Sequence, residues 1–369
     1  MGIVGLVNDR ELLIYLHSLN GVGSRTINKI LANLTTLNEI LDFQPLELSM
    51  KTGIDFKVAE KIVNQLNEKD LLDFLDRLNE WGKLGIDVIT FHDQAYPEML
   101  KEIAQPSWVL FTRGDLGLFQ TPSISIVGTR NPTPYGRMVA EQLAKDLSEY
   151  GWVITSGMAR GIDRFAHEGA LKSDGKTIAV LGNGIDVIYP KENKKIYEAI
   201  IEKGLIVSEY PPGTQPHPGF FPQRNRIISG LTYGTIVVEA SLRSGSLITA
   251  QYALEQSREV FAVPGPITSK QSFGTNALIK QGAKCIQEVN DILEEFPYLK
   301  FSSRKDSKLE VQLSESEEKI YSMIHSQIHI NEIIDLLSLT LSEVYEILLS
   351  LQLKDKIKQL PGGFYMRKN

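Results

Sequence analysis

Helical periodicity dominates the first 84 residues. Apolar residues recur at helical spacing in ELLIYLHSL, pause at NGVGS (20–24) and resume in TINKILANL, which predicts a helical hairpin over residues 9–40. A weaker copy of this pattern follows around TGID (52–55) and FKVAEKIVNQL, and helical spacing continues to about Gly82. The pattern therefore predicts a helical module over residues 1–84.

Between residues 85 and 297 the period changes to that of short strands alternating with helices. IDVITF and SWVLFTR form a lead-in, and six apolar strand patterns follow from residue 123: SISIV, WVITS, TIAVL, LIVSE, GTIVVEA and EVFAV. Such apolar strands, separated by helix patterns, are typical of a parallel sheet that is covered on both faces. We therefore predict an α/β domain over residues 85–297.

The remaining residues predict a linker and a small third module. The polar stretch FSSRKDSKLE has the composition of a linker, which we place at 298–309. Residues 310–369 contain three helix patterns, SESEEKIYSMIHS, INEIIDLLS and LSEVYEILLSLQLKD, followed by a turn at Gly362-Gly363. Three helices closed by a β-turn predict a winged-helix module.

Composition indicates the compartment and restricts where an anionic ligand could bind. A single cysteine, Cys285, and the absence of a signal-like N-terminus or a long apolar run lead us to expect a cytoplasmic protein without membrane insertion. The net charge is -6, and residues 1–120 carry the whole excess, with 11 Lys and Arg against 17 Asp and Glu. Residues 121–297 carry 18 of each kind, so any nucleic-acid site must be a local basic cluster there.

Glycine and arginine follow the first two strands of the predicted sheet. GTRNP (128–132) comes after the first strand and SGMARGID (156–163) after the second. In parallel sheets ligands bind beyond the carboxyl ends of the strands, where glycines expose backbone N–H groups and arginines can hold phosphate. These loops are therefore candidates for an anion site, although their glycines could simply form tight turns. The third loop, GNGID (182–186), fits a plain turn equally well.

Aromatic and basic residues adjoin at a predicted helix start, FFPQRNRIISG (220–230). Cations oppose the macrodipole at a helix N-terminus, so two arginines there suggest an anionic ligand, and phosphate with flat aromatic faces is what single-stranded nucleic acid requires. In the alternative interpretation the phenylalanines are core residues and the arginines pair with Glu209 and Glu239. SLRSGS (241–246) precedes another helix and offers hydroxyl and N–H donors.

Catalytic signatures are missing from the sequence. It contains neither GxGxxG after the first strand nor GxxxxGK[ST], and its His and Cys residues lack zinc-ligand spacing. We therefore expect no cofactor, no metal and no enzymatic activity. One alternative is a Rossmann-like nucleotide phosphoribohydrolase, because GTIVVE (234–239) is similar to its glutamate-ended strand. The other is a winged-helix regulator that binds duplex DNA.

The motifs of residues 95–297 together resemble the DNA-processing protein A family (DprA, also called Smf). The strings that carry the resemblance, in order, are SIVGTRNPTPYG, SGMARGID, LGNGIDVIYP, SEYPPG, FFPQRNRIISGL, VVEASLRSGSLITA, VPGP and GTNALIKQGA. The resemblance implies an extended Rossmann-like domain that binds single-stranded DNA and forms a homodimer. It also implies a role in loading the RecA recombinase during natural transformation.

The resemblance also implies a set of DNA-binding residues. It places a phosphate-binding arginine at Arg130, and its RNR motif at Arg224, Asn225 and Arg226. Its stacking aromatic corresponds to Phe220 or Phe221. With the loop residues above, the candidates for single-stranded DNA are Gly128, Arg130, Ser156, Gly157, Arg160, Phe220, Phe221, Arg224, Asn225, Arg226, Ser244, Gly245 and Ser246.

The two flanking modules also resemble DNA-binding folds. LNGVG (19–23) resembles the loop of helix-hairpin-helix or SAM-like modules, but Asn20 stands where that loop usually has proline, and the region is acidic. We therefore favour a structural role for this module. The helices of the predicted winged helix are acidic as well, which disfavours groove binding and leaves protein interaction open.

Overall fold

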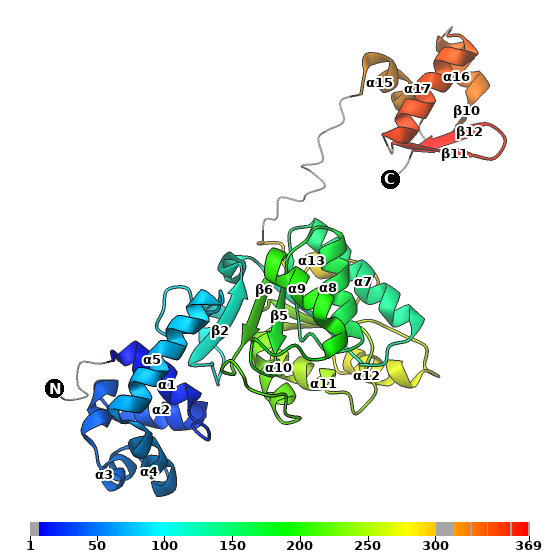
Figure 1. Cartoon of the computed structure of the whole chain (residues 1–369). Coiled ribbons are helices and arrows are strands. Elements are labelled where there is room, and N and C mark those ends of the chain that lie inside the picture. Colours follow the sequence, from blue (N-terminus) through cyan, green and yellow to red (C-terminus); the bar gives the residue numbers. More distant parts are fainter. Residues whose placement is uncertain (1–6, 300–312, 325–326, 338, 355, 368–369) are drawn as a thin grey trace. The chain divides into compact units, whose positions relative to one another are not determined.

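The computed structural model describes residues 7–299, 313–324, 327–337, 339–354 and 356–367. Internal contacts divide the chain into two compact units, Met1–Phe301 and Ser302–Asn369 (Figure 1). Most of the predicted linker, residues 300–309, lies outside the described residues. No helix in the described ranges has both the length and the apolar character needed to cross a membrane.

The N-terminal part of the larger unit consists of helices, as the periodicity predicts. They are α1 (Asp9–Ser18), α2 (Ser24–Asn33), α3 (Pro45–Thr52), α4 (Phe56–Gln65) and α5 (Glu68–Lys83), with a 3-10 helix at Leu37–Asp42. Local sequence sets their ends: Asn8 and Glu11 form a capping box at the start of α1, and Asp55 caps α4. The predicted break at residues 20–23 is the α1–α2 turn.

These helices share a core with one edge of the central sheet. Buried Leu12 and Phe74 belong to the same apolar cluster as Val109 and Phe111 of the sheet. The ring of Trp81 meets that of Phe111 edge-on, with 5.5 Å between centroids. The helical module is therefore packed against the sheet rather than tethered to it.

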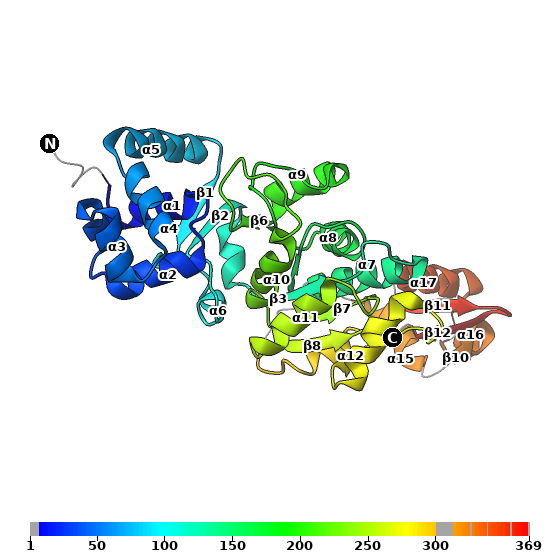
Figure 2. The same cartoon turned by 90° about the horizontal axis from the view of Figure 1, so that it is seen from below.

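The large sheet has nine strands in the order β1-β2-β6-β5-β4-β3-β7-β8-β9 (Figures 1 and 2). The strands are β1 (Asp87–Thr90), β2 (Val109–Gly114), β3 (Ser123–Val127), β4 (Val153–Ser156), β5 (Thr177–Leu181), β6 (Leu205–Ser208), β7 (Gly234–Val237), β8 (Glu259–Ala262) and β9 (Lys284–Cys285). Strands β3 to β9 pair in parallel, as expected. The lead-in strands β1 and β2 add an antiparallel edge, which the sequence interpretation left out.

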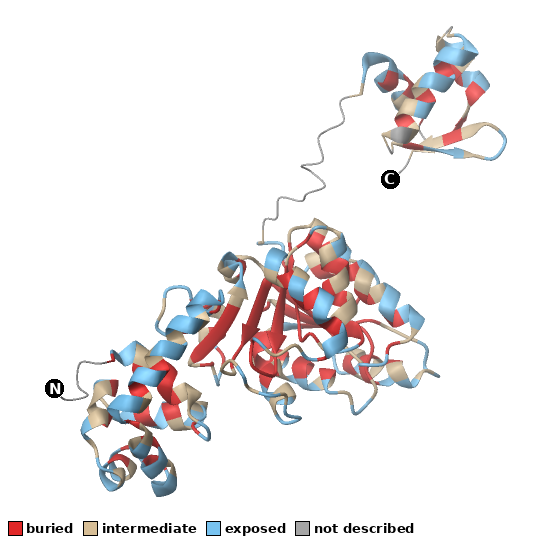
Figure 3. Ribbon diagram, viewed as in Figure 1, coloured by how far each residue is buried: buried red, intermediate tan, exposed pale blue. Residues whose placement is uncertain are grey.

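Helices cover both faces of this sheet, and the strands between them are buried (Figure 3). Apolar residues of α7 and α8 pack on one face, and those of α10, α11 and α12 on the other. The helices of this part are α6 (Glu98–Lys101), α7 (Pro134–Glu149), α8 (Ile162–Lys172), α9 (Lys194–Lys203), α10 (Phe220–Gly230), α11 (Ser246–Glu255), α12 (Phe273–Lys280) and α13 (Asn290–Leu293). The Rossmann-like α/β fold is thus confirmed.

The smaller unit is a three-helix module with a β-wing, as predicted for a winged helix. It contains α15 (Glu315–Met323), α16 (Ile330–Leu337) and α17 (Leu341–Leu353), with β10 (Gln327–His329), β11 (Ile357–Leu360) and β12 (Phe364–Arg367). The strand order is β10-β12-β11, so a third strand that the sequence interpretation missed joins the predicted hairpin. The unit has its own apolar core, in which Ile320, Ile333, Val344 and Leu348 are fully buried.

Candidate functional site

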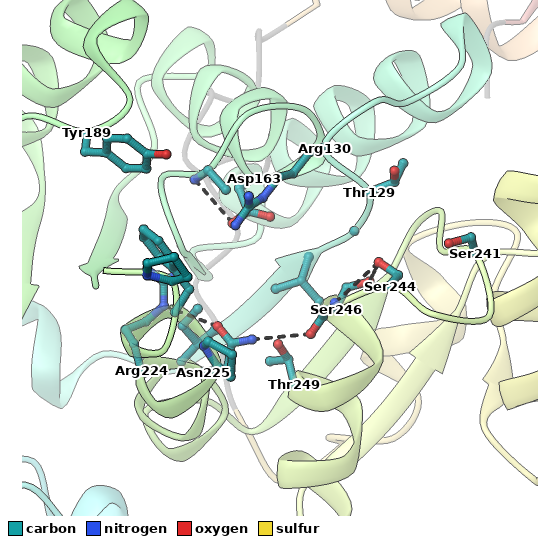
Figure 4. A pocket seen from close by; sticks show the side chains of 18 residues that line it. Thr129, Arg130, Asp163, Tyr189, Arg224, Asn225, Ser241, Ser244, Ser246 and Thr249 are labelled. Atoms are coloured by element: carbon teal, nitrogen blue, oxygen red, sulfur yellow. Dashed lines mark hydrogen bonds between the residues drawn. The ribbon is translucent and has the colours of Figure 1, made fainter. Parts of the chain in front are cut away.

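A cavity of about 500 Å³ opens at the carboxyl edge of the large sheet. The chain runs from β3 through β4 and β5 to β6, and then returns to the other side of β3 with β7. The order therefore reverses between β3 and β7, which is where ligands bind in open α/β sheets. Residues after β3, from α10 and at the start of α11 line the cavity (Figure 4).

Two arginines of different character face this cavity. Arg130 is exposed, and its guanidinium lies 5.6 Å from the centre of the Phe221 ring. Arg224 is only 3 % exposed and donates a 2.8 Å hydrogen bond to the carbonyl of Gly157. Burial lowers the pKa of Arg224 to about 10, so this side chain is still a cation at neutral pH. The cavity thus contains one buried positive charge held by hydrogen bonds, that of Arg224, and one exposed positive charge, that of Arg130.

A buried carboxylate, Asp163, lies in the same cavity. Burial raises the pKa of the Asp163 carboxyl, although Arg224 and Arg130 favour its charged form. The side chain of Asp163 accepts a 3.4 Å hydrogen bond from the backbone of Ala159. Two arginines against one carboxylate leave the charged lining of the cavity with a net positive charge.

Glycines bring these loops close together. A Cβ on Gly157 would lie 2.6 Å from a guanidinium nitrogen of Arg224, so only glycine leaves room for that side chain. Gly161 has φ +77°, and a Cβ there would lie 2.3 Å from the carbonyl oxygen of Thr129. At Gly157 the close contact is with a side chain that lines the cavity, whereas the positive φ of Gly161 is equally what a tight turn requires.

The start of helix α11 supplies neutral donors. Ser244, Gly245 and Ser246 line the cavity, and the two serine hydroxyls lie 2.8 Å apart. Asn225 of α10 donates a 3.3 Å hydrogen bond to the carbonyl of Gly245, which ties the two helices together. A helix N-terminus with two serine hydroxyls beside it suits an anionic ligand.

Two stacked aromatic rings also line the cavity. The rings of Tyr189 and Phe221 stack with 5.6 Å between centroids and 27° between planes. A smaller cavity of about 50 Å³ adjoins these rings and is lined by Gly157, Arg160 and Phe221, among others. The third loop contributes to it through Gly182 and Asn183.

The structure brings together eight of the predicted site residues in the larger cavity. They are Gly128, Arg130, Phe221, Arg224, Asn225, Ser244, Gly245 and Ser246. Gly157 and Arg160 line only the smaller cavity, where Arg160 forms an ion pair with Glu192. The predicted residues Ser156, Phe220 and Arg226 line neither.

Each of these three residues has another partner. The hydroxyl of Ser156 is buried and donates a 2.6 Å hydrogen bond to the carbonyl of Ile126. The ring of Phe220 stacks on that of Tyr210, with 4.2 Å between centroids. Arg226 is buried and pairs with Glu209, as the alternative interpretation held for one arginine. We therefore leave these three residues, together with the ion-paired Arg160, out of the proposed binding site.

The helix-start argument for the arginine pair was wrong. Helix α10 begins at Phe220, so Arg224 and Arg226 lie in its second turn and not at its N-terminus. Residues two apart on a helix point in different directions, which explains why one arginine reaches the cavity and the other a carboxylate.

The cavity is also lined by residues that were not among the predicted site residues, including Thr129, Asp163 and Tyr189. The run RGID at 160–163 could have suggested Asp163, since the carboxylate comes directly after a glycine–arginine loop. Tyr189 lies in the stretch between β5 and α9, where the sequence offers no periodic signal.

Comparisons with known proteins agree with this fold. The family model described as DNA recombination-mediator protein A matches residues 87–297, more than half of the chain. The chain belongs to this family. Models of a SAM-like helix-hairpin-helix tandem and of the DprA winged-helix domain match residues 12–68 and 306–363. The DNA processing protein DprA of Bacillus subtilis is 48% identical over 221 residues, which are 60% of this chain and 74% of that protein.

Other members of the DNA recombination-mediator protein A family have solved structures that are similar to this one. DNA processing protein A of Streptococcus pneumoniae is 38% identical with a TM-score of 0.69, covering 79% of this chain and 99% of that one. The Helicobacter pylori protein is 34% identical with a TM-score of 0.52, covering 57% of this chain and 96% of that one. Its structure was described in terms of a unique single-stranded DNA binding mode.

Proposed function

We propose that this protein binds single-stranded DNA in the cavity between β3 and β7. The observation that carries the proposal is the meeting of Arg130, Arg224, the α11 N-terminus and the Phe221 ring around one cavity. Phosphate groups would lie against the cations and the serine hydroxyls at the start of α11, and a base would stack on the Phe221 ring. The single-stranded DNA binding described for the Helicobacter pylori relative supports this function.

Arg130 would exchange partners when DNA binds. In the free protein its guanidinium lies over the Phe221 ring. A phosphate is a stronger partner for arginine than an aromatic face, because it accepts charge-assisted hydrogen bonds. We propose that Arg130 turns to the phosphate and that a base takes its place over the ring.

We further propose that the protein acts as a homodimer that protects incoming DNA and helps to load the RecA recombinase. Membership of a family described as DNA recombination-mediator proteins supports this role. We also propose that the protein has no catalytic role and works in the cytoplasm.

Glu239, on which the phosphoribohydrolase alternative depends, lies outside this cavity. Its carboxylate accepts a 2.8 Å hydrogen bond from the backbone of Thr133 and a second bond from the Thr133 hydroxyl. The carboxylate thus holds the start of α7 instead of facing the two arginines. This arrangement favours DNA binding over nucleotide cleavage.

The Phe221→Ala substitution should weaken binding of a short oligothymidine, because base stacking on an aromatic contributes about 1–3 kcal/mol. The dissociation constant, followed by fluorescence anisotropy, should rise roughly 5- to 150-fold. Phe220→Ala is the matched control and should bind like the wild type, since Phe220 stacks on Tyr210 outside the cavity. Equal effects of both variants, or tighter binding of the wild type to duplex than to single strand, would contradict the proposal.

A further inference from the structure

Helix α17 carries an unpaired apolar surface. Leu341, Tyr345 and Leu349 are 52%, 49% and 56% exposed, and exposed residues are pale blue in Figure 3. They are spaced four residues apart, so they lie along one side of the helix. We call these three residues the α17 stripe. Leu336 of the neighbouring α16 is also exposed.

The stripe is separate from the core of its module. Val344, Leu348 and Leu351 of the same helix are fully buried and hold α17 in the fold. On another side of α17, Ser350 donates a 2.7 Å hydrogen bond to Glu317 of α15. Both the core contact and the α15 contact of α17 are therefore made without the stripe. Three large apolar residues in a row at the surface are typical of an interaction site.

The charged residues of α16 and α17 are all acidic. Helices α16 and α17 contain Glu332, Asp335, Glu343 and Glu346, which are exposed, and no lysine or arginine. In DNA-binding helix-turn-helix folds the second helix enters the major groove, and α17 occupies that position after α16. Acidic side chains there would meet phosphates of the same sign, so duplex DNA is disfavoured.

The same charges disfavour a second copy of this module. If two α17 stripes met, Glu346 and Asp335 of one copy would be brought toward the acidic residues of the other, and like charges at an interface are costly. A helix with apolar residues at matching spacing and lysine or arginine beside them would instead be attracted. Such amphipathic helices bind apolar surfaces through anchors at i, i+3, i+4 and i+7.

We propose that the α17 stripe is a docking surface for a basic amphipathic helix of a partner protein. The apolar side chains of the partner would cover Leu341, Tyr345 and Leu349, and its cations would pair with Glu346 and Asp335. The winged-helix module then serves as a protein-binding module, independently of the single-stranded DNA site in the larger unit.

The test uses the full chain and a designed peptide of about 18 residues, with leucines at i, i+3, i+4 and i+7 and lysines on the remaining face. A scrambled peptide of the same composition controls for general attraction to an anionic protein. The ordered peptide should bind more tightly than the scrambled one in fluorescence anisotropy. The double variant Leu341→Ser with Leu349→Ser should weaken its binding about tenfold or more.

Two further variants distinguish the possible outcomes. Asp335→Lys with Glu346→Lys should reverse the preference toward a peptide that has glutamates in place of lysines; Glu343 is spared because it forms the capping box of α17. Leu46→Ser, at an equally exposed leucine of α3, should leave peptide binding unchanged. Equal binding of ordered and scrambled peptides would overturn the proposal. So would binding of duplex DNA that the double serine variant weakens, or a wild-type oligomer that the same variant dissolves.

Discussion

Replacing Arg226 by methionine should lower the free energy of unfolding of the larger unit by about 3–5 kcal/mol, because it leaves a buried carboxylate without its partner. Arg226 and Glu209 are both almost completely buried, at 7% and 8% exposure. Two guanidinium nitrogens of Arg226 donate to the two carboxylate oxygens of Glu209, and a third donates to the carbonyl of Gln105. Urea unfolding followed by tryptophan fluorescence measures the loss.

The ion pair also connects the helical module to helix α10. His17 of α1 lies 2.7 Å from the backbone oxygen of Glu209, and the hydroxyl of Ser24 donates to its carboxylate. Burial lowers the pKa of His17, so the imidazole is neutral and donates from Nε2. Because Arg226 lies outside the cavity, the Arg226→Met variant should keep wild-type affinity for oligothymidine wherever it is folded. A selective loss of DNA binding without loss of stability would return Arg226 to the binding site.

The control is the double variant Glu209→Met with Arg226→Met. It removes both charges and should recover most of the lost stability, because a well-packed apolar pair often replaces a buried ion pair at little cost.

The dependence of stability on pH provides a second control. Burial alone would raise the pKa of Glu209, but Arg226 more than offsets this effect and the pKa is lowered. The contribution of the pair should therefore persist above the ordinary glutamate pKa and disappear as the pH falls through the lowered value.

The fold could be predicted from the sequence wherever one period persists over a whole element. The apolar strands from SISIV to EVFAV and the helix patterns between them correspond to β3 to β8 and their covering helices. The antiparallel edge was missed because a strand's partner and direction are set by tertiary packing, and β2 pairs with β6, which lies about 95 residues further along. Strand β10 has three residues, too few to show alternation.

The site could be predicted down to its loops but not down to each side chain. The loops GTRNP and SGMARGID were identified as candidates because each comes directly after a strand. The structure does bring both loops to the edge of one cavity. A shift of one or two positions along a helix turns a side chain to another side of it. Whether a particular side chain faces the cavity therefore depends on its exact position in the helix. Phe220 and Phe221 are the same residue type, as are Arg224 and Arg226. The members of each pair differ only in the direction in which their side chains leave the helix. The buried partner of Arg226, Glu209, is 17 residues away and could be proposed but not chosen from the sequence.

Arg130→Ala should cause the largest loss of DNA affinity of any single substitution at the cavity mouth. Within the described residues its guanidinium has no hydrogen bond or ion pair, and it lies against the Phe221 ring. It is therefore free to bind a phosphate without first breaking a salt bridge. A hydrogen bond to a charged group contributes about 1.5–3 kcal/mol, so the dissociation constant should rise roughly 10- to 150-fold.

Salt dependence separates this loss from a structural effect. Each phosphate neutralised on a single strand contributes about -0.7 to the slope of log affinity against log salt, so Arg130→Ala should make the slope shallower by about that amount. Arg160→Ala is the matched control, because Glu192 already neutralises Arg160. It should leave both the affinity and the slope close to those of the wild type. If the two variants gave the same slope, Arg130 would not be the phosphate-binding cation. The loss of an unpaired, phosphate-binding arginine must change the number of counterions released on binding, whereas the loss of an arginine paired with a carboxylate should not.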